Sequence, residues 1–81
     1  MQDAARKAIN LALLDLAKSP QNYVRLQPLT DGVIQRIRLL AKIPDGKTEG
    51  IFGCNINDQQ WNVTVRLSES AVDLTGEKSV T

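Results

Sequence analysis

Regular alternation of side-chain type after Gln60 is the feature of this sequence that most constrains its fold. Four apolar residues alternate with four polar ones: Trp61, Val63, Val65 and Leu67 against Asn62, Thr64, Arg66 and Ser68. Successive side chains of a β-strand point to opposite faces, so the pattern predicts a strand over Gln60–Leu67 with one face buried. A sheet built from such strands needs a second layer to cover its apolar face.

The N-terminal segment from Asp3 to Lys18 supplies that layer as a predicted helix. Asp3 can cap its start, and Ser19-Pro20 ends it because proline disfavours helical geometry in the residue before it. Ala8, Leu11 and Leu14 make the apolar stripe wider than a surface helix needs. We therefore keep two interpretations: either the stripe only covers the sheet, or its surplus side contacts a second copy. The stripe follows helical spacing through Ala5, Ile9, Ala12, Leu13 and Leu16.

Further strands are predicted on both sides of the chain's centre. Asn22–Leu29 alternates polar and apolar residues until Pro28, which ends the pairing or places this strand at an edge. Ile51–Ile56 alternates in the same way and is followed by the tight-turn signal Asn57-Asp58. Ala71–Leu74 is long enough for one more short strand. Counted with Val33–Ile43 as a strand, the sequence thus predicts three or four strands joined as an antiparallel meander.

The segment Val33–Ile43 fits two periodicities. As a strand, it places Val33 and Ile37 on one face and both Arg36 and Arg38 on the other. As a helix, it starts at a cap from Thr30 or Asp31 and ends before Pro44-Asp45-Gly46. We prefer the strand because Leu39 and Ile43 fit the helix poorly, and the helix remains the alternative.

The fold class predicted from these segments is α+β, with the N-terminal helix packed on one face of a meander of three or four antiparallel strands. A chain of 81 residues is long enough for one domain. We expect that domain to span residues 1–75. Residues 76–81 are expected to form a flexible tail.

Composition excludes several kinds of chemistry. The sequence has no histidine and one cysteine, Cys54, so it lacks the usual general base and cannot build a cysteine zinc cluster. Cys54 lies in the inward set of its strand, which favours a buried structural thiol. We expect no enzyme, no catalytic residue, no metal and no cofactor. A single cysteine and the lack of a long apolar run indicate a cytoplasmic protein that does not cross a membrane.

The candidate site is the open face of the predicted sheet. If Val33–Ile43 is a strand, that face carries arginines and no carboxylate within the strands. A guanidinium binds phosphate or carboxylate through two hydrogen bonds, so the face is a predicted partner- or anion-binding surface. The alternative is a solvent-exposed face that has no binding role and whose charges prevent aggregation. The predicted site residues are Tyr23, Arg25, Arg36, Arg38 and Arg66.

Apolar residues predicted on the same face decide which function we expect. Ile34 and Leu40 would lie beside the arginines, and such a mixture is more typical of a protein interface than of a phosphate track. We expect a small non-enzymatic adaptor or regulatory protein that acts through protein–protein contacts, with a second copy of itself among the candidate partners. The alternative is a nucleic-acid-binding module that uses the arginine-rich face, for which only Tyr23 offers a stacking ring.

Overall fold

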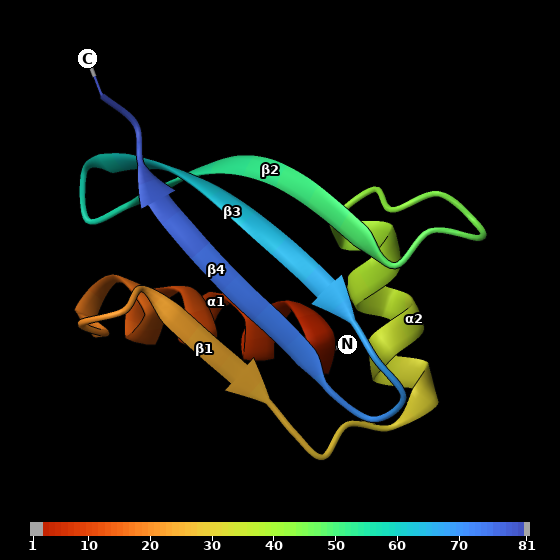
Figure 1. Ribbon diagram of the computed structural model, residues 1–81. Helices are drawn as coiled ribbons and strands as arrows, with labels where there is room; N and C mark the ends of the chain where they lie inside the picture. Colours follow the sequence, from red (N-terminus) through yellow and green to blue (C-terminus); the bar gives the residue numbers. More distant parts are fainter. Residues whose placement is uncertain (1–2, 81) are drawn as a thin grey trace.

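Four antiparallel strands and two helices form the part of the chain described by the computed structural model, residues 3–80 (Figure 1). This arrangement confirms the predicted α+β class. The elements are, in order, α1 (Ala4–Lys18), β1 (Tyr23–Leu26), α2 (Asp31–Leu40), β2 (Glu49–Ile56), β3 (Gln59–Leu67) and β4 (Val72–Lys78).

The sheet has the strand order β1-β4-β3-β2, so β2, β3 and β4 form an antiparallel meander and β1 pairs with β4 at one side. Asn57 and Asp58 alone connect β2 to β3, and both have positive φ values, 51° and 65°. Two-residue hairpin loops favour this left-handed geometry, which Asn and Asp tolerate better than most residues. The sheet therefore ends at β1 on one side and at β2 on the other.

Helix α1 begins and ends as the sequence predicts. The Asp3 carboxylate accepts a hydrogen bond from the Arg6 N–H at 3.1 Å, and the helix ends at Lys18, before Ser19-Pro20. Such a cap satisfies one of the N–H groups that have no partner inside the helix. The buried face of α1 consists of Ala5, Ile9, Ala12 and Leu16.

The preference for a strand over Val33–Ile43 was wrong, because Asp31–Leu40 forms helix α2. The Thr30 side chain caps it by accepting a hydrogen bond from the Val33 N–H at 3.3 Å. Ile34 and Ile37, three residues apart, are buried together on one side of the helix. The helix leaves the Leu39 side chain 66% exposed. The cap at Thr30 and the burial of Ile34 and Ile37 stabilise the helix by more than the exposure of Leu39 destabilises it.

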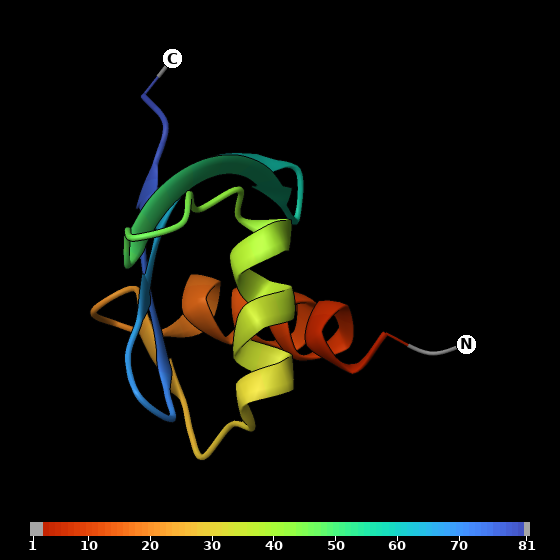
Figure 2. The same ribbon diagram turned by 90° about the vertical axis from the view of Figure 1, so that its right-hand side faces the viewer.

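Both helices lie on the same side of the sheet, so the protein has two layers and one uncovered sheet face (Figure 2). The inward residues of the strands, including Trp61, Val63, Val65 and Leu74, are almost completely buried against the helices. Figure 2 also shows β2 curving over the top of the helix layer. In the described part of the chain, neither helix is long and apolar enough to cross a membrane.

The last strand is longer than predicted. β4 extends to Lys78, so residues 76–78, which we expected in a flexible tail, pair with β3. Gly76 lies directly beneath Leu16 and Trp61, and the Lys78 ammonium lies 5.7 Å from the centroid of the Trp61 ring. Residues 1–2 of the predicted domain and residue 81 of the predicted tail lie outside the described residues.

Candidate functional site

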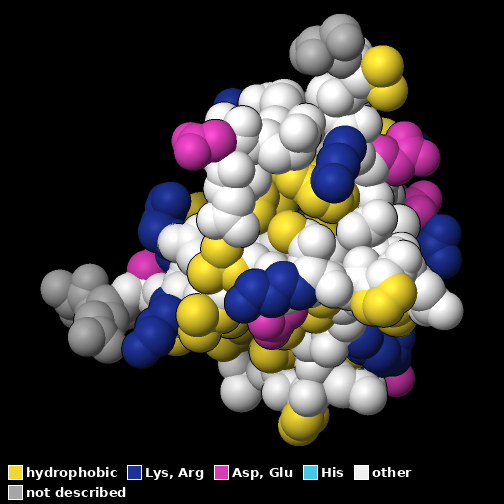
Figure 3. Space-filling view, turned by 90° about the vertical axis from the view of Figure 1, so that its left-hand side faces the viewer, with side chains coloured by type: hydrophobic (Ala, Val, Ile, Leu, Met, Phe, Trp, Pro, Cys, Tyr) yellow, Lys and Arg dark blue, Asp and Glu magenta, His cyan; other side chains and the backbone are white. Residues whose placement is uncertain are grey.

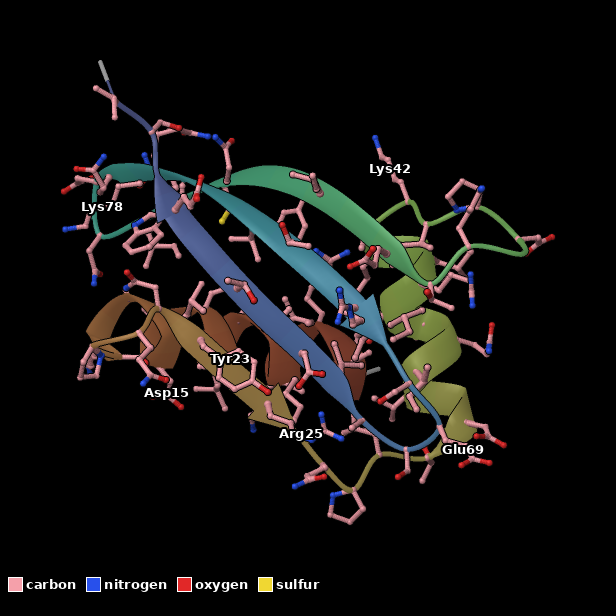
Figure 4. The ribbon with its side chains drawn as sticks, viewed as in Figure 1. Asp15, Tyr23, Arg25, Lys42, Glu69 and Lys78 are labelled. Atoms are coloured by element: carbon pink, nitrogen blue, oxygen red, sulfur yellow. The ribbon has the colours of Figure 1, made fainter. Side chains whose placement is uncertain are left out.

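The five predicted site residues do not form one surface. Tyr23 and Arg25 lie on β1, with their side chains on the uncovered sheet face (Figure 4). Arg66 of β3 lies on the same face, because it is in register with Arg25 through Asp73. Arg36 and Arg38 lie on α2 instead, because the segment that carries them is helical. The prediction that Arg36 and Arg38 lie on the open sheet face was therefore wrong, because the segment that carries them is a helix and not a strand.

The two arginines of α2 hold the protein's own elements together. Arg36 Nε donates to the Asp3 carboxylate at 3.1 Å and so joins α2 to the start of α1. Arg38 Nη1 donates to the backbone oxygens of Pro44, at 2.9 Å, and Lys47, at 2.6 Å. Arg38 thereby fixes the loop that leads into β2. In this arrangement both guanidinium groups already have acceptors within the chain.

The uncovered face also carries carboxylates, contrary to our prediction that its strands lack them. Asp73 of β4 and Glu49 of β2 lie in register with Arg25 and Arg66, so the row Arg25-Asp73-Arg66-Glu49 alternates in charge across all four strands. Arg25 Nη1 lies 2.9 Å from both Asp73 oxygens, and Arg66 Nη2 lies 2.7 Å from Glu49 Oε1. The contact with Glu49 raises the pKa of Arg66. Cross-strand neighbours of opposite sign make this face self-complementary.

A shallow cavity of about 250 Å³ lies on this charged row and the row beside it. At the border of the cavity, the Tyr23 hydroxyl donates a hydrogen bond to the Asp73 carboxylate at 2.8 Å. Among the described residues, Tyr23 is the aromatic side chain on this face that could stack on a base, and this hydrogen bond holds it in place. Positive and negative groups alternate around the cavity, which gives an approaching phosphate no net attraction. The residues that line it are Tyr23, Glu49, Thr64, Arg66, Asp73 and Thr75.

Cys54 is the one thiol, and it lies half-buried on the inner face of β2. Burial raises the pKa of this thiol, which lowers the fraction of reactive thiolate at neutral pH. Within residues 3–80, no three carboxylate or thiol side chains come together as a metal site. Cys54 lies on the inner side of its strand as predicted, but it is half-buried rather than buried.

The outer edge of β2 presents an unpaired strand backbone. In a two-residue hairpin the flanking residues, here Ile56 and Gln59, form a hydrogen-bonded pair, and every second residue back along β2 also bonds to β3. The hydrogen bond from the Leu67 N–H to the Thr48 oxygen, 2.8 Å, follows the same alternation. The N–H and C=O groups of the intervening residues therefore point away from the sheet: Glu49, Ile51, Gly53 and Asn55.

The two edges of the sheet differ in how they are protected. β1 has four residues, carries Arg25, and is flanked by Pro20 and Pro28, which limits pairing with another strand. β2 has eight residues and no proline, and from Gly50 to Ile56 it carries no charge. Ile51, at the middle of this edge, is 71% exposed. β2 thus lacks the features that keep a strand edge from pairing.

An apolar crevice of about 200 Å³ opens beneath β2, between the strand and the two helices. Half-buried Phe52 and Cys54 form its roof, Leu13 of α1 and Leu40 of α2 form its sides, and Ile37 lies at its base. Arg6 at its rim is exposed and makes no ion pair among the described residues. A mainly apolar cavity with a charged rim is typical of surfaces that take up another apolar group.

The apolar stripe of α1 remains partly uncovered, as the wide spacing predicts. Leu11 is 55% exposed and Leu14 is 41% exposed, and Leu14 follows one turn after Asn10, which lines the crevice. Figure 3 shows hydrophobic side chains over the α1 side of the molecule. The edge of β2 and the crevice beneath it together form what we call the β2 surface.

The β2 surface was not predicted from the sequence, because the predicted site was chosen by its charged side chains and β2 carries almost none. The signal that could have revealed it is a contrast between two strands: one is bounded by prolines and carries an arginine, and the other is an uncharged run from Gly50 to Ile56. Which strand lies at an edge, however, depends on strand order, which the alternation of side chains does not encode.

Comparison with known proteins finds no match for this chain among protein-family models, curated proteins or solved structures.

Proposed function

We propose that this chain is a small non-enzymatic adaptor or regulatory module that acts through protein–protein contacts, and that its binding surface is the β2 surface. The observation that supports this most directly is the unpaired, uncharged edge of β2 above an apolar crevice. Addition of a strand to such an edge provides affinity through backbone hydrogen bonds and specificity through side-chain pockets. We place this function in the cytoplasm, where a lone thiol stays reduced.

The arginine-rich face, which was the reason to consider nucleic-acid binding, is not present as predicted. Arg25 and Arg66 face carboxylates at hydrogen-bond distance, and Arg36 and Arg38 lie on another element. Counterion-driven binding needs several unpaired cations along one track, and the net charge of the chain is only +1. We therefore move the candidate site from the arginines to β2.

Proline at Ile51 tests the proposal without disturbing the sheet, because the Ile51 N–H points away from β3 and proline is tolerated at such edge positions. Ile51→Thr is the matched variant, since it removes the apolar side chain but keeps the N–H. Tagged wild type, both variants and the control Gln35→Lys, an exposed position on α2, serve as baits in an extract of the source cells.

We expect the wild type and Gln35→Lys to capture the same protein partner, a second copy of the chain included, and Ile51→Pro to lose it. Circular dichroism of each bait checks that the fold is kept. Equal capture by Ile51→Pro, or no captured protein and no self-association at all, would reject the β2 surface as the binding site.

A further inference from the structure

We infer that the partner of the β2 edge is a second copy of this chain, paired strand to antiparallel strand about a two-fold axis at Phe52, which makes one eight-stranded sheet. This inference rests on the proposed function and names the partner of the same surface. A two-fold contact requires that the surface complements itself, so that each residue meets its symmetry-related neighbour without conflict. The residues of β2 meet that requirement in one register.

Backbone hydrogen bonding selects that register. With the axis at Phe52, the outward residue Glu49 faces Asn55 of the second copy, and Ile51 faces Gly53 of the second copy. Each pair occurs twice by symmetry and exchanges two hydrogen bonds, so the contact gains about eight of them. Moving the axis to Ile51 or Gly53 leaves an outward residue opposite a loop or a turn. The axis at Phe52 therefore uses every outward group of the edge.

Side-chain sizes complement one another in the same register. On the outer face, exposed Ile51 lies over Gly53 of the second copy, which has no side chain to oppose it. On the inner face, Cys54 lies opposite Gly50 of the second copy, and the two Phe52 rings meet at the axis. Aromatic side chains that meet across strands stabilise pairing. The two crevices then open toward each other beneath the joined strands.

Charge also complements itself. Within the paired strands the one charged residue, Glu49, faces a neutral asparagine, and its carboxylate is already held by Arg66. Beyond the strands, the register brings the Asn57-Asp58 turn of one copy beside the loop at Lys47 of the other. Asp58 and Lys47 are exposed and make no ion pair within residues 3–80, so each is available to the other copy. Within the paired strands, Glu49 to Asn55, no two like charges are opposed.

The edge of β2 is a more favourable contact surface for a second copy than the outer side of α1. The exposed leucines of α1, Leu11 and Leu14, are flanked by Lys7, Asp15 and Lys18 on the same side of the helix. A contact there would bury charges without backbone hydrogen bonds to compensate, which is costly. The β2 edge offers hydrogen bonds and apolar area together.

Sedimentation equilibrium from low micromolar to millimolar protein tests the association. We expect the wild type and Gln35→Lys to approach twice the monomer mass and Ile51→Pro to remain at the monomer mass. In the wild type, the amide hydrogens of Ile51, Gly53 and Asn55 should exchange more slowly as concentration rises. A wild type that stays monomeric at millimolar concentration overturns the inference. The proposed function survives that result if a different protein is captured by the wild type and lost with Ile51→Pro.

Charge exchange separates a second copy from an unrelated partner. Asp58→Lys and Lys47→Asp should each weaken the dimer by several-fold, and the double variant should recover most of that loss, because the opposite charges meet again with their signs exchanged. Additive weakening in the double variant overturns the proposed placement of the two copies.

Single cysteines locate the axis. In a Cys54→Ser background, Ile51→Cys, Phe52→Cys and Gly53→Cys are oxidised and the rate of disulfide-linked dimer is measured. A residue that faces itself in an antiparallel pair has the Cα separation that a disulfide requires. We expect Phe52→Cys to cross-link fastest and Thr75→Cys, exposed on the outer face of β4, to cross-link slowest. A fastest rate at Ile51, Gly53 or Thr75 overturns the register and, with it, the inference as stated.

Discussion

Replacing Gly76 with alanine tests the packing that holds α1 against the sheet and so shapes the crevice beneath β2. A Cβ at this position would lie 2.6 Å from Leu16 Cδ2 and 3.0 Å from Trp61 Cε3. Carbon atoms are in favourable contact at about 3.5–4.0 Å, so a neighbour must move by roughly 1 Å. Leu16 is 0% exposed and Trp61 1%, so both side chains are enclosed by neighbouring groups. Overpacking of this kind costs about 1–3 kcal/mol, and we expect about 2 kcal/mol for Gly76→Ala.

Urea unfolding followed by the fluorescence of Trp61, the one tryptophan, measures this change as a shift in the free energy of unfolding. The matched control is Gly32→Ala in the first turn of α2, where nothing lies within 4 Å of an added Cβ. Alanine is the better helix former, so this variant should gain about 0.5–1 kcal/mol. All proteins are compared at one concentration, because self-association would add to the stability.

A double-mutant cycle with Leu16→Ala shows whether the cost comes from the predicted contact. Leu16→Ala alone should lose about 2–5 kcal/mol because it leaves a cavity. It also makes room for the new methyl group, so the double variant should be less destabilised than the sum of the two by about 1–2 kcal/mol. A Gly76→Ala protein as stable as the wild type, or strictly additive losses, would refute the close approach of α1 to β4.

Three further predictions follow from individual side chains. Thr30→Ala should destabilise the fold by about 1 kcal/mol, measured by urea unfolding, because it removes the cap of α2. The pKa of Asp3 is lowered, first by the Arg6 N–H and then by Arg36, so its contribution to stability is present at neutral pH and is lost as the pH falls through that lowered pKa. Thermal unfolding of Asp3→Asn should therefore show less loss of stability between neutral and acidic pH than the wild type. Asp73→Asn should destabilise more than Glu49→Gln, because Asp73 is the less exposed carboxylate, at 18% against 50%, and accepts bonds from both Tyr23 and Arg25. The opposite order in urea unfolding would show that the charged row does not act as we describe.

Local patterns predicted the elements whose signals agree with each other. In α1, the cap at Asp3, the helical stripe and the stop at Ser19-Pro20 all indicate one helix, and β3 shows unbroken alternation. Val33–Ile43 was misread because its apolar residues fit both periods, and the deciding bond, from the Val33 N–H to the Thr30 side chain, is a single contact at one end. A short apolar run does not separate the two structures without its tertiary partners.

The error in the candidate site follows from that misreading and from the unknown order of the strands. A strand over Val33–Ile43 placed Arg36 and Arg38 on the sheet. Glu49 was assigned to a loop, and nothing in the sequence paired the segment that holds Asp73 with the strand of Arg25, so the partners of Arg25 and Arg66 were not recognised. Register decides which side chains become neighbours, and register is a property of pairing rather than of one strand.

The order of the strands places the charged strand inside the sheet and the uncharged strand at its edge, and this distribution bears on binding. β4 carries Asp73, Glu77 and Lys78 yet lies inside the sheet, whereas β2, with only Glu49 at its first position, lies at the edge. A monomer that protects itself from edge pairing places charges the other way round. β1 pairs with β4, so the uncharged strand lies at the opposite edge of the sheet. The distribution is therefore unfavourable for an isolated chain and favourable for one whose β2 edge is paired, which is the reason to look for its partner at Ile51 and Gly53.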